Sequence, residues 1–315
     1  MTARRNDERR YLDPKVLARI SGLELRARLI VEGFLSGMHH SPHRGLSVEF
    51  ADHRAYTQGD DLRHIDWKVY GKTDKYYVKE YEQETNLDVL LAVDASESMA
   101  YRSSEAALSK YDYAVSAAAA VAYLTLRQHD AVGLAVFDDG VRTFLRPSNQ
   151  AHRWRAIVER LSEGTGAGTT SLGSVLHEIT ERLRRRTLVV VVSDLFDDPD
   201  AVLKGIRFLR HRRHELILWN VWDRAERTLE MSGPTMFEGL EMSGRLPVDP
   251  SAVRARYLEE VRRFLTRLRA GCAQMQVEYT LFDTSQPLDA VLSGYLAARS
   301  ARLRRRSARV TGGSG

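Results

Sequence analysis

Two carboxylates and two hydroxyls stand where a folded chain could bring them together. Asp94, Ser96 and Ser98 directly follow one short apolar run. Asp194 directly follows a second one, 187–193. Such runs are typical of buried strands, and in an open parallel sheet ligands collect beyond the carboxyl ends of the strands. Because carboxylate and hydroxyl oxygens suit hard divalent cations, the pattern predicts a site for Mg²⁺, with Mn²⁺ as the alternative.

A loop rich in glycine and threonine, 164–171, lies between the two runs and offers a further hydroxyl from Thr169 or Thr170. The same loop lacks the lysine of a phosphate-binding P-loop and follows no predicted strand, so nucleotide binding is not expected. Ser96 and Ser98 have no evident histidine to activate them. A purely structural alternative remains, in which the serines cap the helix after the first strand.

Strands alternate with helices from residue 87 onward, which predicts a doubly wound α/β fold with a mostly parallel sheet. The turn signal Asp138-Asp139-Gly140 predicts a hairpin within this series. The expected strands are 87–94, 131–137, 141–145, 187–193, 215–222 and 276–282. The expected helices are 109–129, 149–162, 172–185, 199–212 and 251–272.

The remaining segments have a different character. Residues 11–35 show apolar positions at helical spacing, and 76–78 is typical of a short strand. The expected organisation is a smaller N-terminal region of helices and short strands at 1–86, an α/β domain at 87–303 with an irregular insertion at 224–250, and a basic, glycine-rich tail at 304–315.

Composition narrows the classes of function. The net charge is +5, and the arginine clusters near 184–186, 210–213 and 302–309 each end a predicted helix, where cations complement the helix dipole. No recognition motif accompanies them, so nucleic-acid binding is not expected, although the last cluster could touch an acidic partner or anionic lipid. The single cysteine, Cys272, excludes an internal disulfide. No run approaches the roughly 20 apolar residues of a membrane span and no signal peptide is evident, so we expect a cytoplasmic protein.

Two patterns together resemble a known family. Asp-x-Ser-x-Ser at 94–98, with a later threonine and Asp194, resembles the metal-ion-dependent adhesion site (MIDAS) of von Willebrand factor A domains. The run from Arg54 to Trp67, centred on Gly59-Asp60-Asp61, resembles the signature of the bacterial family called domain of unknown function 58 (DUF58). The ending Asp283-Thr284, Pro287-Leu288 and Tyr295-Leu296 is similar to that family too.

The resemblance implies a von Willebrand A-like, Rossmann-type fold and a set of metal-site residues. These are Asp94, Ser96, Ser98, Thr170 and Asp194. Thr170 is preferred because the family's Gly-Gly-Thr-Asp pattern falls on residues 168–171, where Thr169 replaces a glycine and Ser171 an aspartate. Thr169 therefore stays a rival ligand.

The resemblance also implies a function that is not enzymatic. It points to a protein-interaction module whose metal ion captures an acidic side chain of a partner. The implied collaborator is a MoxR-type AAA+ ATPase, in the maturation or remodelling of protein complexes whose identity the sequence does not name. The alternatives are a scaffold without metal dependence and a metal-dependent phosphoesterase that uses Asp94 and Asp194. The Gly59-Asp60-Asp61 signature is interpreted as a structural charge network, with a docking surface as its alternative.

Overall fold

The computed structural model describes residues 22–39, 53–55, 77–79, 87–150, 152–166, 168–169, 171–231, 233–239, 244–288 and 294. The chain divides into two compact units. One consists of Met1–Gly37 together with Leu87–Gly315, and the other of Met38–Asn86. Each is described by itself.

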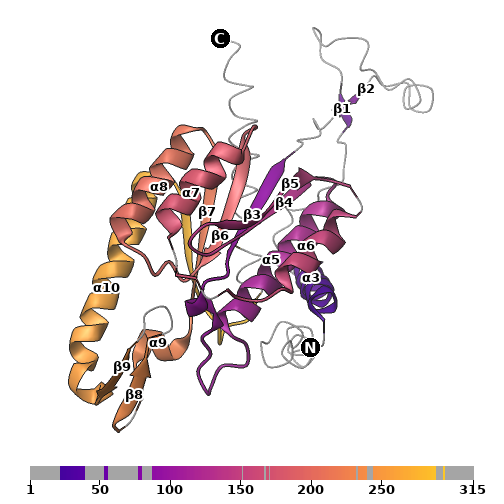
Figure 1. Cartoon of the computed structure of the whole chain (residues 1–315). Coiled ribbons are helices and arrows are strands. Elements are labelled where there is room, and N and C mark those ends of the chain that lie inside the picture. The colour runs from indigo at the N-terminus through magenta and orange to yellow at the C-terminus, as the bar shows by residue number, and fades with distance from the viewer. Residues whose placement is uncertain are drawn as a thin grey trace. The chain divides into compact units, whose positions relative to one another are not determined.

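A six-stranded sheet forms the centre of the larger unit, in the order β10-β7-β6-β3-β4-β5 (Figure 1). All neighbours are parallel except β4 and β5, which form the predicted antiparallel hairpin. The predicted doubly wound, mostly parallel sheet is confirmed. Its strands are β3 (Asp88–Asp94), β4 (Ala131–Phe137), β5 (Val141–Ser148), β6 (Thr187–Ser193), β7 (Glu215–Trp222) and β10 (Glu278–Asp283).

Helices cover both faces of the sheet (Figure 1). Apolar side chains of α7, α8 and α10 join those of β3, β6 and β7 in one core cluster. On the other side, α5 contacts β3 and β4, and α6 packs beside α5. These helices are α5 (Lys110–Arg127), α6 (Arg153–Leu161), α7 (Leu172–Arg182), α8 (Pro199–His211) and α10 (Pro250–Gln274), close to the predicted ranges.

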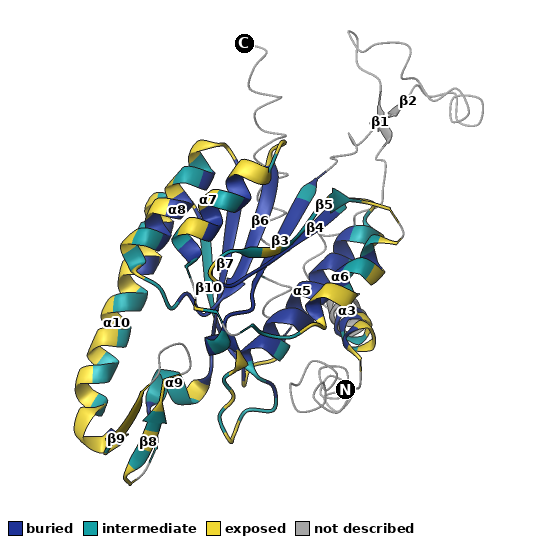
Figure 2. Cartoon of the chain, viewed as in Figure 1, coloured by how far each residue is buried: buried dark blue, intermediate teal, exposed yellow. Residues whose placement is uncertain are grey.

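The two central strands of the sheet, β3 and β6, are buried along almost their whole length. Every residue of β6 is buried, as is all of β3 except Asp88, and Figure 2 shows these strands in the dark blue of buried residues. Parallel strands covered on both faces read as continuous apolar runs, which is the signal that predicts them here. Helix α5 lies against them with a run of buried alanines, whose small side chains permit close approach.

The strand order reverses between β3 and β6. After β3 the chain adds β4 on one side, and after α7 it returns to place β6 on the other side of β3. The turns that follow β3 and β6 therefore lie side by side at the carboxyl edge, where open α/β sheets bind ligands.

The described part of the segment 224–250 contains regular elements, where the sequence predicted irregular structure. It contains α9 (Arg224–Thr228) and an antiparallel hairpin of β8 (Thr235–Glu238) with β9 (Arg245–Val248). The side chains of Asp223 and Glu226 form a capping box that starts α9. Each strand has only four residues, too few for a recognisable alternation.

The N-terminal segment that belongs to the larger unit is a helix, α3 (Leu23–His39). Leu23, Ala27, Ile30 and Val31 are buried in it, at the spacing of a core-facing stripe. Its Arg28 guanidinium lies 5.8 Å from the ring centre of Tyr123 on α5. The stretch predicted as helical at 11–35 is thus confirmed over its second half, and 11–21 lies outside the described residues.

In the smaller unit, β1 (His53–Ala55) pairs antiparallel with β2 (Tyr77–Lys79), which confirms the predicted short strand. Several other predictions fall outside the described residues. These are the Gly59-Asp60-Asp61 signature, Tyr295-Leu296 and the tail at 304–315. In the part of the chain that the structure describes, no helix combines the length and apolar character that crossing a bilayer requires.

Candidate metal centre

The Asp-x-Ser-x-Ser turn begins where β3 ends. The Ser96 backbone N–H donates to Asp94 Oδ1 at 2.9 Å, which folds the turn back over the carboxylate. The Ser96 and Ser98 hydroxyl oxygens then lie 3.1 Å apart, and both residues are buried. A short 3₁₀ helix, η3 (Glu97–Ala100), follows, but Ser96 makes no side-chain capping bond to it. Ser96 therefore does not cap this helix with its side chain, and its hydroxyl contacts both the Ser98 hydroxyl and the Asp94 carboxylate.

The distance between the two serine hydroxyls would allow both of them to bind one magnesium ion. Two neighbouring ligands of an octahedral ion, each at about 2.1 Å, lie roughly 3.0 Å from one another. The Ser96–Ser98 oxygen separation of 3.1 Å matches that edge. Within the described residues, no group of three or more His, Cys, Asp or Glu side chains gathers anywhere. A cation here would therefore be held by a mixed set of hydroxyls and carboxylates, in keeping with the donors that Mg²⁺ accepts.

Asp94 lies buried beneath this turn. Its side chain has no exposed surface, and the Ser193 hydroxyl donates to Asp94 Oδ2 at 2.5 Å. Burial, together with the negative charge of Asp194, raises the pKa of Asp94 to about 7. A nearby cation would favour the charged carboxylate, because an opposite charge stabilises ionisation. Sequence reasoning missed Ser193, although a hydroxyl ending an otherwise apolar strand is a visible signal.

Asp194 reaches the same edge from β6, but other groups already contact its carboxylate. Oδ1 accepts the Phe196 backbone N–H at 3.1 Å, and Oδ2 lies 2.8 Å from Lys110 Nζ. The Trp222 indole N–H donates to the Asp194 backbone carbonyl at 3.1 Å. Asp194 is therefore brought next to Asp94, as predicted, with its charge shared by a lysine that the sequence analysis did not identify.

Lys110 is a fully buried cation that links two acids. Its Nζ also lies 2.7 Å from Glu226 Oε1 on α9, and its side chain has no exposed surface. Burial lowers the pKa of Lys110, but the Asp194 and Glu226 carboxylates together raise it above its ordinary value. The lysine therefore stays charged. A lysine in the first turn of α5 opposes the helix dipole, and that mismatch was the signal available in the sequence.

The glycine-rich loop is fixed over the Asp-x-Ser-x-Ser turn by backbone hydrogen bonds. Gly166 N–H donates to the Ala95 carbonyl at 2.6 Å, and Glu97 N–H donates to the Gly168 carbonyl at 3.2 Å. A Cβ on Gly168 would stand 3.0 Å from Asp138 Cγ, a tight contact that favours glycine at this position. Thr169 lies in this loop and is exposed, whereas Thr170 lies outside the described residues. The choice between the two threonines stays a prediction.

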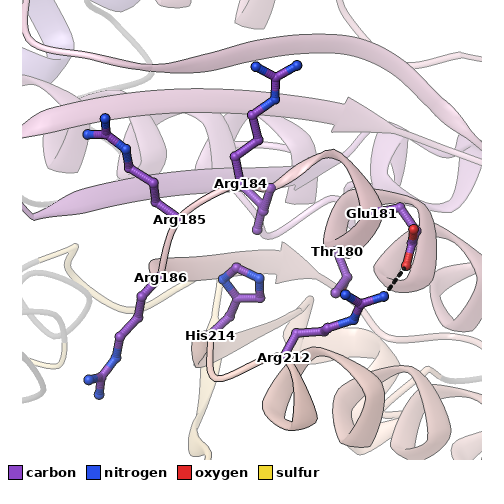
Figure 3. A pocket seen from close by; sticks show the side chains of 8 residues that line it. Thr180, Glu181, Arg184, Arg185, Arg186, Arg212 and His214 are labelled. Atoms are coloured by element: carbon purple, nitrogen blue, oxygen red, sulfur yellow. Dashed lines mark hydrogen bonds and ion pairs between the residues drawn. The ribbon is translucent and has the colours of Figure 1, made fainter.

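A hollow of about 200 Å³ lies at the other end of β6 and β7 (Figure 3). Its lining residues are Thr180, Glu181, Leu183, Arg184, Arg185, Arg186, Arg212 and His214. Arg212 pairs with Glu181 at 3.2 Å, and Arg186 pairs with Glu215 at 2.6 Å. In Figure 3 the Arg184, Arg185 and Arg186 side chains point away from one another. The arginines thus form a solvated edge, and they do not converge on one anion.

The geometry and the motifs together define a class: an α/β protein of von Willebrand A-like fold with an Asp-x-Ser-x-Ser turn at the switch point of its sheet. The family model described as "Protein of unknown function DUF58" matches residues 52–266. The chain belongs to this DUF58 family.

Individual relatives span most of the chain. An uncharacterized protein of Mycobacterium tuberculosis is 28% identical over 269 residues, which are 82% of this chain and 83% of that protein. Among solved structures, the conserved hypothetical protein BatB from Bacteroides thetaiotaomicron is 12% identical, with a TM-score of 0.47 over 69% of this chain and 99% of that one. The SpRpn10 VWA domain is 11% identical, with a TM-score of 0.39 over 66% of this chain and 94% of that one.

Proposed function

We propose that this chain is a protein-interaction module that recognises an acidic side chain of its partner through a bound Mg²⁺. The observation that carries the proposal is the pair of Ser96 and Ser98 hydroxyls, 3.1 Å apart over the buried Asp94. When bound, the ion supplies positive charge and a coordination position that a partner carboxylate can fill. The residues that would hold it are Asp94, Ser96, Ser98 and a threonine of the 164–171 loop, with Asp194 beside them.

The chain's own part in this function is to keep the site preformed. Ser193 and the Ser96 backbone orient Asp94, and the loop carbonyl of Gly168 ties the turn in place. Sites held by packed elements and by supporting hydrogen bonds keep their geometry without a ligand. Binding of a partner would therefore require little further ordering of the site.

An enzymatic role has less support in the site. Both oxygens of Asp94, the nucleophile of the phosphoesterase alternative, already accept hydrogen bonds, and the side chain has no exposed surface. A nucleophile must reach its substrate, and this carboxylate is covered by its own turn. We therefore propose a module without catalysis.

The partner that we propose is an AAA+ ATPase of the MoxR type, acting with this chain in the cytoplasm on the maturation or remodelling of other protein complexes. This part of the proposal rests on membership of the DUF58 family and on the motif resemblance. The test is a pull-down with such an ATPase in Mg²⁺ and in EDTA. Loss of the complex in EDTA is expected, and a complex that survives EDTA unchanged would favour the metal-independent scaffold.

The metal itself is tested by thermal unfolding. With a dissociation constant near 1 mM, about 10 mM Mg²⁺ stabilises the folded state by about 1.4 kcal/mol. For a domain of this size the melting temperature then rises by about 2–5 °C. The rise should vanish in Ser96→Ala/Ser98→Ala. It should persist in the control Ser162→Ala, because the exposed Ser162 hydroxyl bonds only to Val158 of its own helix. No rise in wild type would remove the metal from the proposal.

A further inference from the structure

The buried Lys110 is not a ligand of the proposed metal ion, yet it connects the site residue Asp194 to another element. Its ammonium group touches Asp194 at 2.8 Å and Glu226 at 2.7 Å. The Phe196 ring centre lies 4.9 Å from Nζ and that of Tyr101 lies 5.8 Å away. One positive charge is thus shared between the carboxyl edge of the sheet and α9, inside an aromatic enclosure.

Burial of an ammonium group costs free energy unless carboxylates or other acceptors compensate for its lost hydration. An ammonium and its carboxylates lose hydration on burial, so a buried ion pair is weak evidence for stability by itself. A lysine on the exposed face of α5 would avoid this loss of hydration. The position of Lys110 therefore calls for an explanation other than stabilisation of the fold.

Helix α9, which carries Glu226, is held in place by hydrogen bonds of its own. Glu226 Oε2 accepts the Asp223 backbone N–H at 3.0 Å, and the Glu226 carbonyl accepts the Tyr257 hydroxyl at 2.7 Å. Arg254 of α10 donates to the Thr228 carbonyl at 3.0 Å. A change in the Lys110–Glu226 pair is therefore passed to α9 and to the start of the hairpin segment that follows it.

We propose that Lys110 is a positioning residue that couples cation binding beside Asp94 to α9, through its shared contacts with Asp194 and Glu226. This inference rests on the metal site of the proposed function and deepens it. With a divalent cation at the Asp-x-Ser-x-Ser turn, Lys110 is repelled from that edge and its contact with Glu226 strengthens. Helix α9 and the strands β8 and β9, which carry the exposed apolar side chains of Met236 and Leu246, then respond to occupancy of the site.

Coupling of this kind is reciprocal, so a change at Glu226 must alter affinity at the metal site. Glu226→Gln removes one of the two negative charges that contact Lys110, and glutamine at this position still completes a capping box. Lys110 is then held by Asp194 alone. The affinity for a divalent cation should fall at least about fivefold, the lower end of typical coupling.

The opposite substitution should have the opposite sign. Lys110→Met leaves Asp194 without its counter-charge, so a cation at the site should bind at least about fivefold more tightly. Damage to the fold does not produce tighter binding, so the two variants together separate coupling from disruption. If Lys110→Met does not fold, Glu226→Gln decides the question by itself.

The experiment measures Mn²⁺ affinity by titration and amide hydrogen exchange of α9 with and without Mn²⁺. The matched control is Glu230→Gln, which removes one charge from the same segment at a residue that pairs only with Arg224 and Arg254. We expect weaker binding in Glu226→Gln, near wild-type binding in Glu230→Gln, and slower α9 exchange in Mn²⁺ for wild type but not for Glu226→Gln. Glu226→Gln that binds like Glu230→Gln, or unchanged α9 exchange in a Mn²⁺-bound wild type, overturns this inference only. A wild type that binds no Mn²⁺ overturns the metal site and the inference together.

Discussion

Ser193 donates its hydroxyl to Asp94 across two neighbouring parallel strands, with 2.5 Å between Ser193 Oγ and Asp94 Oδ2. The register of β3 and β6 pairs Val93 with Val192, which brings the two strand ends together. The Ser193 oxygen also accepts the Leu195 backbone N–H at 2.9 Å. One hydroxyl thus fixes both the acid of the first turn and the start of the second turn.

Substitutions at Asp94 should separate the hydrogen-bond role of this residue from its charge. Asp94→Ala leaves the buried Ser193 hydroxyl and the Ser96 N–H without their acceptor, which should lower the free energy of unfolding by about 2–4 kcal/mol. Asp94→Asn retains an acceptor and should lose less than about 1 kcal/mol, yet it should lose cation binding. Urea denaturation measures both values. Equal losses in the two variants would contradict this division of roles.

A close approach of two strands at Gly133 should be sensitive to a single added methyl group. A Cβ on Gly133 in β4 would lie 2.4 Å from the Leu145 carbonyl oxygen and 2.8 Å from the Pro147 nitrogen, both backbone atoms of β5. Gly133→Ala should therefore lower the free energy of unfolding by about 1–3 kcal/mol, the typical cost of overpacking.

Gly140 offers the matched control for Gly133. It lies in the turn between the same two strands, and the nearest atom to its added Cβ is Glu178 Oε2, 4.0 Å away. Gly140→Ala should leave the urea midpoint close to that of wild type. A larger loss at Gly140 than at Gly133 would show that the hairpin turn, rather than the strand contact, limits stability.

The sheet could be predicted from the sequence because its strands are continuous apolar runs. The range predicted for β6, 187–193, is the observed one, and β7 also matches at 215–222. The β8–β9 hairpin could not be predicted in the same way. Strand β8 alternates only between half-buried and exposed positions, and the first three residues of β9 are exposed. Neither strand therefore has the buried apolar face that would mark it in the sequence.

The candidate site could be predicted only in part, for a related reason. Asp94, Ser96 and Ser98 form one local motif, and Asp194 ends a predicted strand, so strand topology alone brings them together. Lys110 reaches Asp194 and Glu226 across 84 and 116 positions of sequence. Side-chain pairing over such separations depends on packing, which spacing in the sequence does not encode.

Cys272 should be inert in the folded protein. It is the single cysteine of the chain and has no exposed surface, and burial raises the pKa of its thiol to about 11. Because the thiolate is the reactive form, a maleimide should label the native protein at neutral pH only as fast as the protein opens. Labelling in urea should give one thiol per chain. Rapid labelling of the native state would show that the α8–α10 contact opens locally.

His214 should make stability depend on pH at the end of the sheet opposite the candidate metal centre. Its side chain is buried, its Nδ1 accepts the Thr187 backbone N–H at 3.2 Å, and burial together with the Arg212 charge lowers its pKa below the ordinary 6.5. As the pH falls through 6.5, the unfolded chain takes up a proton that the folded chain does not. The free energy of unfolding contributed by His214 is therefore present above pH 6.5 and is lost below it.

A substitution at His214 tests this pH dependence directly. His214→Gln keeps an acceptor for the Thr187 N–H but removes the titrating group, so the fall in stability below pH 6.5 should become shallower than in wild type. His211→Gln, at an exposed position at the end of α8, serves as the control and should keep the wild-type slope. Urea denaturation between about pH 5 and pH 8 covers the window in which an unperturbed histidine titrates. Parallel curves for His214→Gln and wild type would contradict this prediction, because they would mean that the pKa of His214 is the same in the folded and unfolded chains.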